Sequence, residues 1–380
     1  MSDKLLTIII PSYNMENFLP KCLGSMVVND AVLMDKLDII VVNDGSKDKT
    51  NEIAHEWEAK YPGIVRVIDK LNGHYGSCIN AALPVAKGLY VKVIDADDWV
   101  DTEAFKRYLR FVAQASSRIE DAPDMIMSNF VFVTNEGRVV KDYSYCAEPG
   151  FDVSQFNFQC GRDPWMHAIA YRTDNLRKLG YVQLTGITHT DVQWLHLPMA
   201  MVKKIAYCPE TVYQYWEVRD GNTCGGDAIF RTYPDLLKVT LQLLKEYRER
   251  VNEFGEAQRK YLLRHILHRV SRGYATYIFE KNRWLKRADL RWFDKQIADN
   301  EPWVYDLLAN NSGQDGVRGR YIILYHRLRN VPLAFHSLIF VWNSFRRALQ
   351  LVSHIRNHGL RFALGKVKRM VLRQGEYKQR

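Results

Sequence analysis

One stretch decides the fold: YVKVIDADDW, residues 90–99. Its first five residues are mostly apolar, which predicts a buried strand. The strand is followed at once by three acids, Asp95, Asp97 and Asp98. Carboxylates this close repel one another unless a cation binds between them. Hard oxygen ligands of this kind suit Mg²⁺ or Mn²⁺, and the oxygens of a diphosphate would complete the octahedron.

A second interpretation of the acidic cluster is a solvated turn before a helix. Asp101 or Thr102 is placed to cap a helix that begins near Glu103. The rest of the chain favours the binding site over the turn, because polar segments also follow the other predicted strands.

The first hundred residues alternate strand and helix patterns. Mostly apolar runs at 6–10, 37–42 and 64–68 are separated by helical patterns near 48–60 and 77–86. Apolar strands separated by single helices predict a parallel sheet with both faces covered, and ligands bind such sheets beyond the carboxyl ends of the strands. The segments found there are SYN (12–14), NDGS (43–46), DK (69–70) and DADD (95–98).

The secondary-structure pattern of the sequence changes near residue 227. Before that point we expect strands at 125–133, 204–207 and 211–215 and a helix at 190–201. After it, helical patterns fill 228–247, 254–277 and 283–299. The chain length suits two domains, and we predict an α/β domain in residues 1–226 and a helical domain in residues 227–380.

Composition adds expectations about the compartment. The six cysteines form no C-x-x-C pair and most have apolar neighbours, so we expect free thiols in a reducing compartment and no zinc site. The apolar run near the N-terminus is too short for a secretory signal. Both features favour a cytoplasmic protein.

The C-terminal region is strongly basic. Residues 318–380 contain fourteen Lys or Arg and one acid, Glu376, whereas the whole chain has a net charge of +10. Apolar residues recur there at helical steps from Leu324 to Leu349. A basic amphipathic helix of this type binds anionic membrane surfaces. We favour that partner over docking on protein or a second protomer as a homodimer, and we expect no nucleic acid.

Four segments carry a family resemblance. They are IIPSYN (9–14), VVNDGSKD (41–48), NGHYG (72–76) with Asn80 and AKG (86–88), and DADDW (95–99). In this order and spacing they resemble a family 2 glycosyltransferase of the bacterial cell-surface polysaccharide type. The resemblance covers roughly residues 5–220, more loosely after 100. It implies a GT-A fold, with a Rossmann-like mixed sheet flanked by helices, and inverting sugar transfer.

The resemblance implies a nucleotide site at the first strand ends. Pro11 and Tyr13 match positions that contact the base and ribose, and Asp44 matches the acid that binds a uracil-type ring. Asn43 departs from the family's usual acid at that position. The Gly-rich loop with Asn72 and Gly73 leads into a helix, whose N-terminus favours a diphosphate; the alternative is an ordinary connection.

The acidic cluster matches the family's D-x-D motif. We predict Asp97 as the direct metal ligand, with Asp95 as a second ligand or nearer the ribose. Asp98 supports the metal or orients the acceptor side. The order among the three stays open, as does the choice of Mn²⁺ or Mg²⁺.

Inversion requires a base that takes the acceptor's proton. In similar enzymes this is an Asp that begins a helix, and Asp191 occupies that position; the alternative is a helix cap. Thr190 departs from the acid that usually precedes the base, and His189 is expected to be a neighbour. Arg219 matches a segment that closes over the diphosphate, with a surface arginine as the alternative.

These residues together predict transfer from a nucleoside-diphosphate sugar, expected to be a UDP-sugar, to a hydroxyl of a glycan or lipid-linked saccharide. The enzyme would work at the inner face of the plasma membrane. One alternative is transfer to a polyprenyl phosphate, an acceptor that needs no base. Another is an inactive scaffold that binds nucleotide or docks on membranes.

Overall fold

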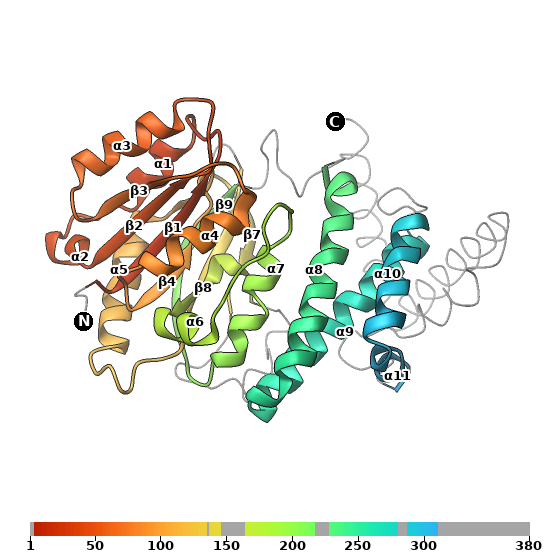
Figure 1. Ribbon diagram of the computed structural model, residues 1–380. Helices are drawn as coiled ribbons and strands as arrows, with labels where there is room; N and C mark the ends of the chain where they lie inside the picture. Colours follow the sequence, from red (N-terminus) through yellow and green to blue (C-terminus); the bar gives the residue numbers. More distant parts are fainter. Residues whose placement is uncertain (1–3, 135–136, 146–163, 217–227, 280–286, 311–380) are drawn as a thin grey trace, which may run out of the picture. The chain divides into compact units, whose positions relative to one another are not determined.

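The computed structural model describes residues 4–134, 137–145, 164–216, 228–279 and 287–310. Within these residues nine strands form one sheet in the order β3-β2-β1-β4-β8-β6-β9-β5, and β7 pairs with β6 (Figure 1). The chain divides into two compact units, residues 1–319 and 320–380. The second unit lies outside the described residues, and so does the whole of the predicted basic helix.

The first half of the sheet is parallel, as predicted. It contains β1 (Leu6–Ser12), β2 (Leu37–Asn43), β3 (Val65–Asp69) and β4 (Tyr90–Val93), with β1 between β2 and β4. Every residue of β1, β2 and β4 is buried. Strands buried on both faces read as continuous apolar runs, which is why the sequence pattern located them well.

Four helices connect these strands. They are α1 (Leu19–Ser25), α2 (Ala31–Asp35), α3 (Thr50–Lys60) and α4 (His74–Ala82). A 3-10 turn, η1 (Leu83–Val85), follows α4 and contains Pro84. The helix predicted at 77–86 therefore begins three residues earlier and tightens near the proline, because proline donates no backbone hydrogen bond.

The second half makes the sheet mixed. Its elements are β5 (Trp99–Val100), α5 (Thr102–Ala115), β6 (Met125–Val133), β7 (Val139–Tyr143), η2 (Met166–Ala168), β8 (Ile169–Arg172) and α6 (Thr173–Leu179). β8 runs antiparallel to both β4 and β6, and so joins the two halves. Asp101 does cap α5, since its side chain accepts from Ala104 N at 2.8 Å.

Two predicted elements differ in the structure. The strands expected at 204–207 and 211–215 are one strand, β9 (Ile205–Trp216), whose pairing with β6 shifts register after Cys208. The helix expected at 190–201 is a short helix, α7 (Asp191–Trp194), and a 3-10 turn, η3 (Leu197–Met201). Pro198 lies at the start of η3, where it cannot continue the hydrogen bonds of a longer helix.

Helices follow the sheet, as expected. They are α8 (Ala228–Arg250), the turn η4 (Val251–Glu253), α9 (Glu256–Phe279), α10 (Arg287–Asn300) and α11 (Trp303–Asn310). Arg250 donates to Leu179 O at 2.9 Å and Gln258 to Val202 O at 2.6 Å, so α8 and α9 pack on the α/β elements. The predicted boundary at 226/227 lies outside the described residues and stays a prediction.

Two further expectations concern cysteines and membranes. Cys22, Cys78 and Cys208 are buried free thiols. Among the helices of the described ranges, none has the length and apolar character needed to cross a membrane. The predicted membrane or protein docking of residues 318–380 falls outside these ranges.

Candidate functional site

The loops that follow β1, β2 and β3 are joined by backbone hydrogen bonds. Asp44 N donates to Ser12 O at 2.8 Å, and Lys70 N donates to Asn43 O at 3.1 Å. Parallel strands end at the same edge of a sheet, so these bonds hold three polar segments side by side. The structure thus brings together the strand ends that the sequence singled out.

Asp44 is the centre of this edge. Its buried side chain accepts three hydrogen bonds at Oδ1, from Lys70 Nζ at 2.5 Å, Gly73 N at 3.0 Å and Ser77 Oγ at 3.5 Å. Asn72 Nδ2 donates to the Asp44 carbonyl at 3.0 Å. Asp44 Oδ2 accepts none within the described part of the chain. The predicted residues Asp44, Asn72 and Gly73 therefore form one hydrogen-bonded unit with one carboxylate oxygen left over.

Pro11 and Tyr13 lie on either side of the end of β1. Pro11 is buried in the strand opposite Val42. Tyr13 follows the strand with 40% of its surface exposed, which is unusual for so large a ring. Tyr13 is therefore available to a ligand, whereas Pro11 is part of the buried strand that precedes it.

Asn43, the departure from the family motif, has a physical explanation. Its Nδ2 donates to Asp69 Oδ1 at 2.9 Å, and its Oδ1 accepts from Ser46 N at 3.1 Å. The other oxygen of Asp69 lies 2.9 Å from His55 Nε2. An aspartate at position 43 would place a second carboxylate against Asp69, so an amide is the side chain that satisfies both neighbours.

Asn43→Asp is expected to lower the free energy of unfolding by about 1 kcal/mol, because a donor becomes a repelling acceptor. Urea unfolding at neutral pH measures the change. Combining it with Asp69→Asn restores a donor–acceptor pair and should recover most of the loss. An unchanged midpoint for Asn43→Asp alone would show that the pair is unimportant.

The acidic loop after β4 is held by two tyrosines and a backbone amide. Tyr75 Oη, from α4, donates to Asp95 Oδ1 at 2.8 Å. Tyr213 Oη, from β9, donates to Asp98 Oδ2 at 2.6 Å, and Trp216 N donates to Asp98 Oδ1 at 2.8 Å. Asp98 is 3% exposed and has both oxygens engaged. It therefore ties the loop to β9, a role that the sequence alone did not distinguish.

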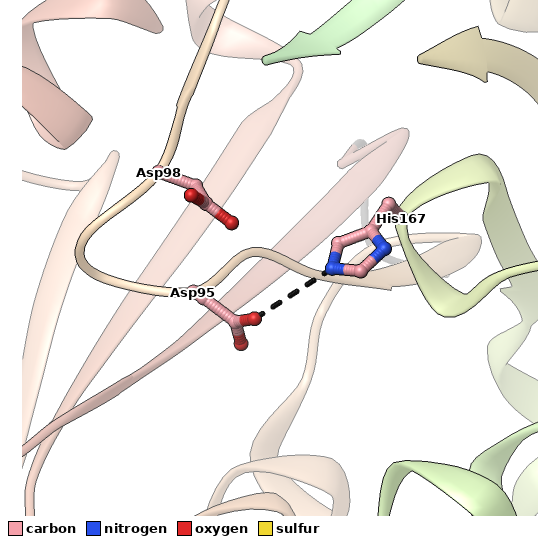
Figure 2. Close-up of side chains that lie close together, drawn as sticks. All are labelled: Asp95, Asp98 and His167. Atoms are coloured by element: carbon pink, nitrogen blue, oxygen red, sulfur yellow. Dashed lines mark ion pairs between the residues drawn. The ribbon is translucent and has the colours of Figure 1, made fainter. Parts of the chain in front are cut away.

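The charges of this loop fit a divalent cation. Burial raises the pKa of Asp98 well above its usual range, and the charges of Asp97 and Asp95 raise it further. Potential ligand atoms of Asp95, Asp98 and His167 lie within 4.8 Å of one another (Figure 2). A cation close to the three carboxylates would relieve the repulsion between them. Asp97 is not in this group of three, and its predicted role as metal ligand stays a prediction.

His167 is a member of the site that no sequence motif marks. It lies in η2, just before β8, and is 5% exposed. Its Nε2 lies 3.8 Å from Asp95 Oδ2. A single histidine near an irregular stretch carries no signal, and only the pairing of β8 with β4 brings it to the acidic loop.

Asp191 begins α7 and is half-buried. Its carboxylate makes no hydrogen bond or ion pair among the described residues. Burial raises the pKa of Tyr75 well above its usual value, and the charges of Asp95 and then Asp191 raise it further. Asp191 is thus close enough to act on the tyrosine that holds Asp95. The charges of the acidic loop and of Asp191 thus both act on Tyr75.

The segment that leads to Asp191 is fastened to α4. Asn80 and Gln183 exchange two hydrogen bonds of 2.8 Å, Asn80 Nδ2 to the Gln183 carbonyl and Gln183 N to Asn80 Oδ1. Beside them α4 approaches this segment so closely that a Cβ on Gly76 would lie 1.8 Å from Leu184 O. Gly76 and Asn80 both belong to the motif segments, and this contact is the physical reason for them.

Thr190 replaces the usual acid in a place that suits a hydroxyl. Its side chain is buried, and Oγ1 accepts from Gln183 Nε2 at 3.0 Å. His189 adopts a φ of 58°, and its Nε2 lies 2.9 Å from Thr232 Oγ1 of α8. The ring of His189 is therefore engaged with α8. Arg219, the predicted phosphate ligand, lies outside the described residues.

Residues 7–121 match the family model described as Glycosyl transferase family 2. This N-terminal part of the chain is similar to the glycosyltransferases of family 2. It is 26% identical to the uncharacterized glycosyltransferase MG025 of Mycoplasma genitalium, over 58% of this chain and 71% of that protein. It is 34% identical to a poly(ribitol-phosphate) beta-glucosyltransferase of Bacillus spizizenii, over 30% of this chain and 18% of that protein.

Among solved structures, the chain is similar to S. aureus TarS 1–349, determined in complex with UDP-GlcNAc. The TM-score is 0.58 with 17% identity, over 85% of this chain and 91% of that chain. The likeness shows the fold, a GT-A-type mixed sheet with flanking helices and a helical C-terminal region. The predicted fold class is therefore confirmed.

Proposed function

We propose that this glycosyltransferase moves a sugar from a UDP-sugar, with inversion, to a hydroxyl of a glycan or lipid-linked saccharide in cell-surface polysaccharide synthesis. One observation carries the proposal: Tyr75 is bonded to Asp95 and lies within the electrostatic reach of Asp191. The charges of Asp95, on the donor side, and of Asp191, which has no hydrogen bond among the described residues, thus both act on one phenol. Two similar proteins support the proposed donor and acceptor classes. One is the poly(ribitol-phosphate) glucosyltransferase, by its name, and the other is TarS, by its bound UDP-GlcNAc.

The nucleotide half of the reaction would use the unit centred on Asp44. Asp44 Oδ2, which accepts no hydrogen bond from the described residues, would accept from a uracil N–H. The exposed ring of Tyr13, close to Pro11 in the chain, would face the base. Asn72 and Gly73 lie at the start of α4, whose amides favour the diphosphate. Arg219 would close over the same phosphates.

A divalent cation, Mn²⁺ or Mg²⁺, would lie between the acidic loop and the diphosphate. Asp97 and Asp95 are the proposed ligands, because the oxygens of Asp98 already accept two hydrogen bonds. When bound, the cation stabilises the charge of the leaving nucleoside diphosphate. Tyr75 and Tyr213 keep the carboxylates of the loop in place while this charge develops.

The acceptor half would use Asp191 as general base. Its side chain is half-buried and faces no competing donor among the described residues, so it is free to take a hydroxyl proton. The oxygen of that hydroxyl then attacks the anomeric carbon from the side opposite the diphosphate. For a lipid-linked acceptor we propose that the protein works at the inner face of the membrane, with residues 318–380 as the contact.

Calorimetry of UDP and GDP, each with Mn²⁺ and with EDTA, tests the donor site. We expect UDP to bind in the presence of Mn²⁺, and Asp97→Ala to weaken that binding at least about tenfold, because a charged ligand contact is lost. Asp142→Ala removes an acid from β7 as the matched control. Tighter GDP binding would redirect the proposal to GDP-sugars, and no metal-dependent binding of either would leave the scaffold as the better explanation.

A further inference from the structure

The ring of His167 is held in one orientation by its neighbours. Aromatic rings surround it, with centroid distances of 4.6 Å to Tyr213, 5.0 Å to Tyr215 and 5.4 Å to Phe130. Its backbone carbonyl accepts from the buried Lys92 Nζ at 2.5 Å. The packing leaves little freedom for the side chain to turn, so the direction in which its nitrogens face is a property of the fold.

One nitrogen of this ring faces the acidic loop. Nε2 points toward Asp95 Oδ2 at 3.8 Å, which is too long for a hydrogen bond (Figure 2). Asp95 Oδ1 is occupied by Tyr75, and both oxygens of Asp98 are occupied by β9. In the group formed by Asp95, Asp98 and His167, hydrogen-bonding capacity therefore remains at Nε2 and Asp95 Oδ2, as far as the described residues show.

The other nitrogen decides where the proton of His167 resides. Nδ1 is buried and has no hydrogen-bond partner among the residues that the structure describes. A buried N–H without an acceptor is rarer in proteins than an unused acceptor. The neutral ring therefore carries its proton on Nε2, which makes that atom a donor. Metal ligation through Nε2 would require the opposite tautomer, with an orphaned N–H at Nδ1.

A donor and an acceptor 3.8 Å apart are complementary to a single hydroxyl group. A hydroxyl oxygen about 2.8 Å from each atom accepts from one and donates to the other. A metal ion would require two acceptor atoms, and a phosphate would require two donors. The combination of one donor and one acceptor therefore favours a hydroxyl group.

We propose that His167 and Asp95 together bind one hydroxyl group of the nucleotide-sugar. Nε2–H donates to the hydroxyl oxygen, and the hydroxyl donates to Asp95 Oδ2. This inference rests on the proposed donor site and adds a residue to it. The hydroxyl belongs either to the ribose or to the sugar that is transferred, and the two sources are separable because UDP contains only the first.

The test compares wild type, His167→Phe and His167→Gln by calorimetry with Mn²⁺. Phenylalanine fits the aromatic surroundings and removes both nitrogens, whereas glutamine keeps a donor. The probes are UDP, its 2′-deoxy and 3′-deoxy forms, and UDP-GlcNAc. His196→Phe is the matched control, because His196 is another buried histidine with an unpartnered Nδ1, placed beside His265 and Arg269 instead.

For a ribose hydroxyl, His167→Phe should weaken UDP binding about tenfold. One of the two deoxy nucleotides should then bind wild type as weakly as UDP binds His167→Phe. Its affinity should not fall further in the variant. For a hydroxyl of the transferred sugar, UDP should bind unchanged and only UDP-GlcNAc should weaken. In both cases His167→Gln should recover part of the affinity, a recovery that a purely structural role would not produce.

Equal affinity of wild type and His167→Phe for UDP and UDP-GlcNAc would overturn the inference and leave the proposed function standing. Manganese electron paramagnetic resonance measures Mn²⁺ binding directly. A loss of Mn²⁺ affinity in His167→Phe would also overturn the inference, since it would show that the imidazole is a metal ligand. If wild type binds no nucleotide with Mn²⁺, the proposed function itself fails and this inference fails with it. Should His167→Phe not fold, His167→Gln against the deoxy nucleotides decides the same question.

Discussion

Asp191→Asn is expected to lower the rate of sugar transfer roughly 10²–10⁴-fold, the range for loss of a general base. The amide has the size of the carboxylate but cannot take a proton. Binding of UDP with Mn²⁺ should stay within about twofold of wild type, because Asp44, Asn72 and Gly73 lie on other loops. The measurement pairs single-turnover transfer from the preferred UDP-sugar with calorimetry on the same samples.

The structure predicts that Asp191→Asn removes no hydrogen bond or ion pair between described residues. The Asp191 carboxylate bonds to no other described residue, and α7 is held instead by Gln193, which accepts from Leu184 N at 2.8 Å and donates to Glu246 at 2.7 Å. Asp174→Asn is the matched control. It also removes an acid from the first turn of a helix, but among the described residues its exposed side chain pairs only with Arg177, at 3.8 Å.

The outcome also separates two reactions. A hydroxyl acceptor needs a base, whereas a polyprenyl phosphate is already anionic. Transfer that survives in Asp191→Asn would therefore exclude the proposed base and favour the polyprenyl-phosphate alternative. A loss of UDP affinity together with transfer would instead show that the substitution had disturbed the donor site.

Gly76→Ala is expected to disrupt the protein more than any other single methyl group added near the site. The new Cβ would lie 1.8 Å from Leu184 O and 2.9 Å from Leu184 C, and backbone atoms cannot move aside as a side-chain tip can. Overpacking of this kind costs roughly 3 kcal/mol or more of unfolding free energy. Sugar transfer should fall to background, because the displaced segment leads directly to Asp191.

Urea unfolding and transfer rates measure both effects. Gly24→Ala is the matched control, since a Cβ there would meet only the ring edge of Trp57 at 3.7 Å, an ordinary contact. Alanine also favours a helix over glycine, so Gly24→Ala should be neutral or slightly stabilising. Wild-type stability and turnover in Gly76→Ala would mean that α4 and the 183–184 segment are farther apart than the structure has them.

The secondary structure was predictable wherever a residue's burial follows from local periodicity. Strands β1, β2 and β4 are buried on both faces, and their apolar runs end close to the predicted residues. Prediction failed where a neighbour decided the outcome. β9 continues through Pro209 because its extra residues form an irregularity at which the pairing with β6 shifts register. The helix after Asp191 breaks at Pro198.

The candidate site shows the same division. The sequence by itself determined that polar strand ends meet at one sheet edge, because parallel strands and their loops are local patterns repeated in order. It singled out Asp44, Asp95 and Asp191 as candidates. The tertiary structure alone decided which atoms of these residues are occupied, since Tyr213 and His167 reach the acidic loop from far along the chain. Such contacts depend on strand order and on packing, which cannot be inferred from the spacing of these residues in the sequence.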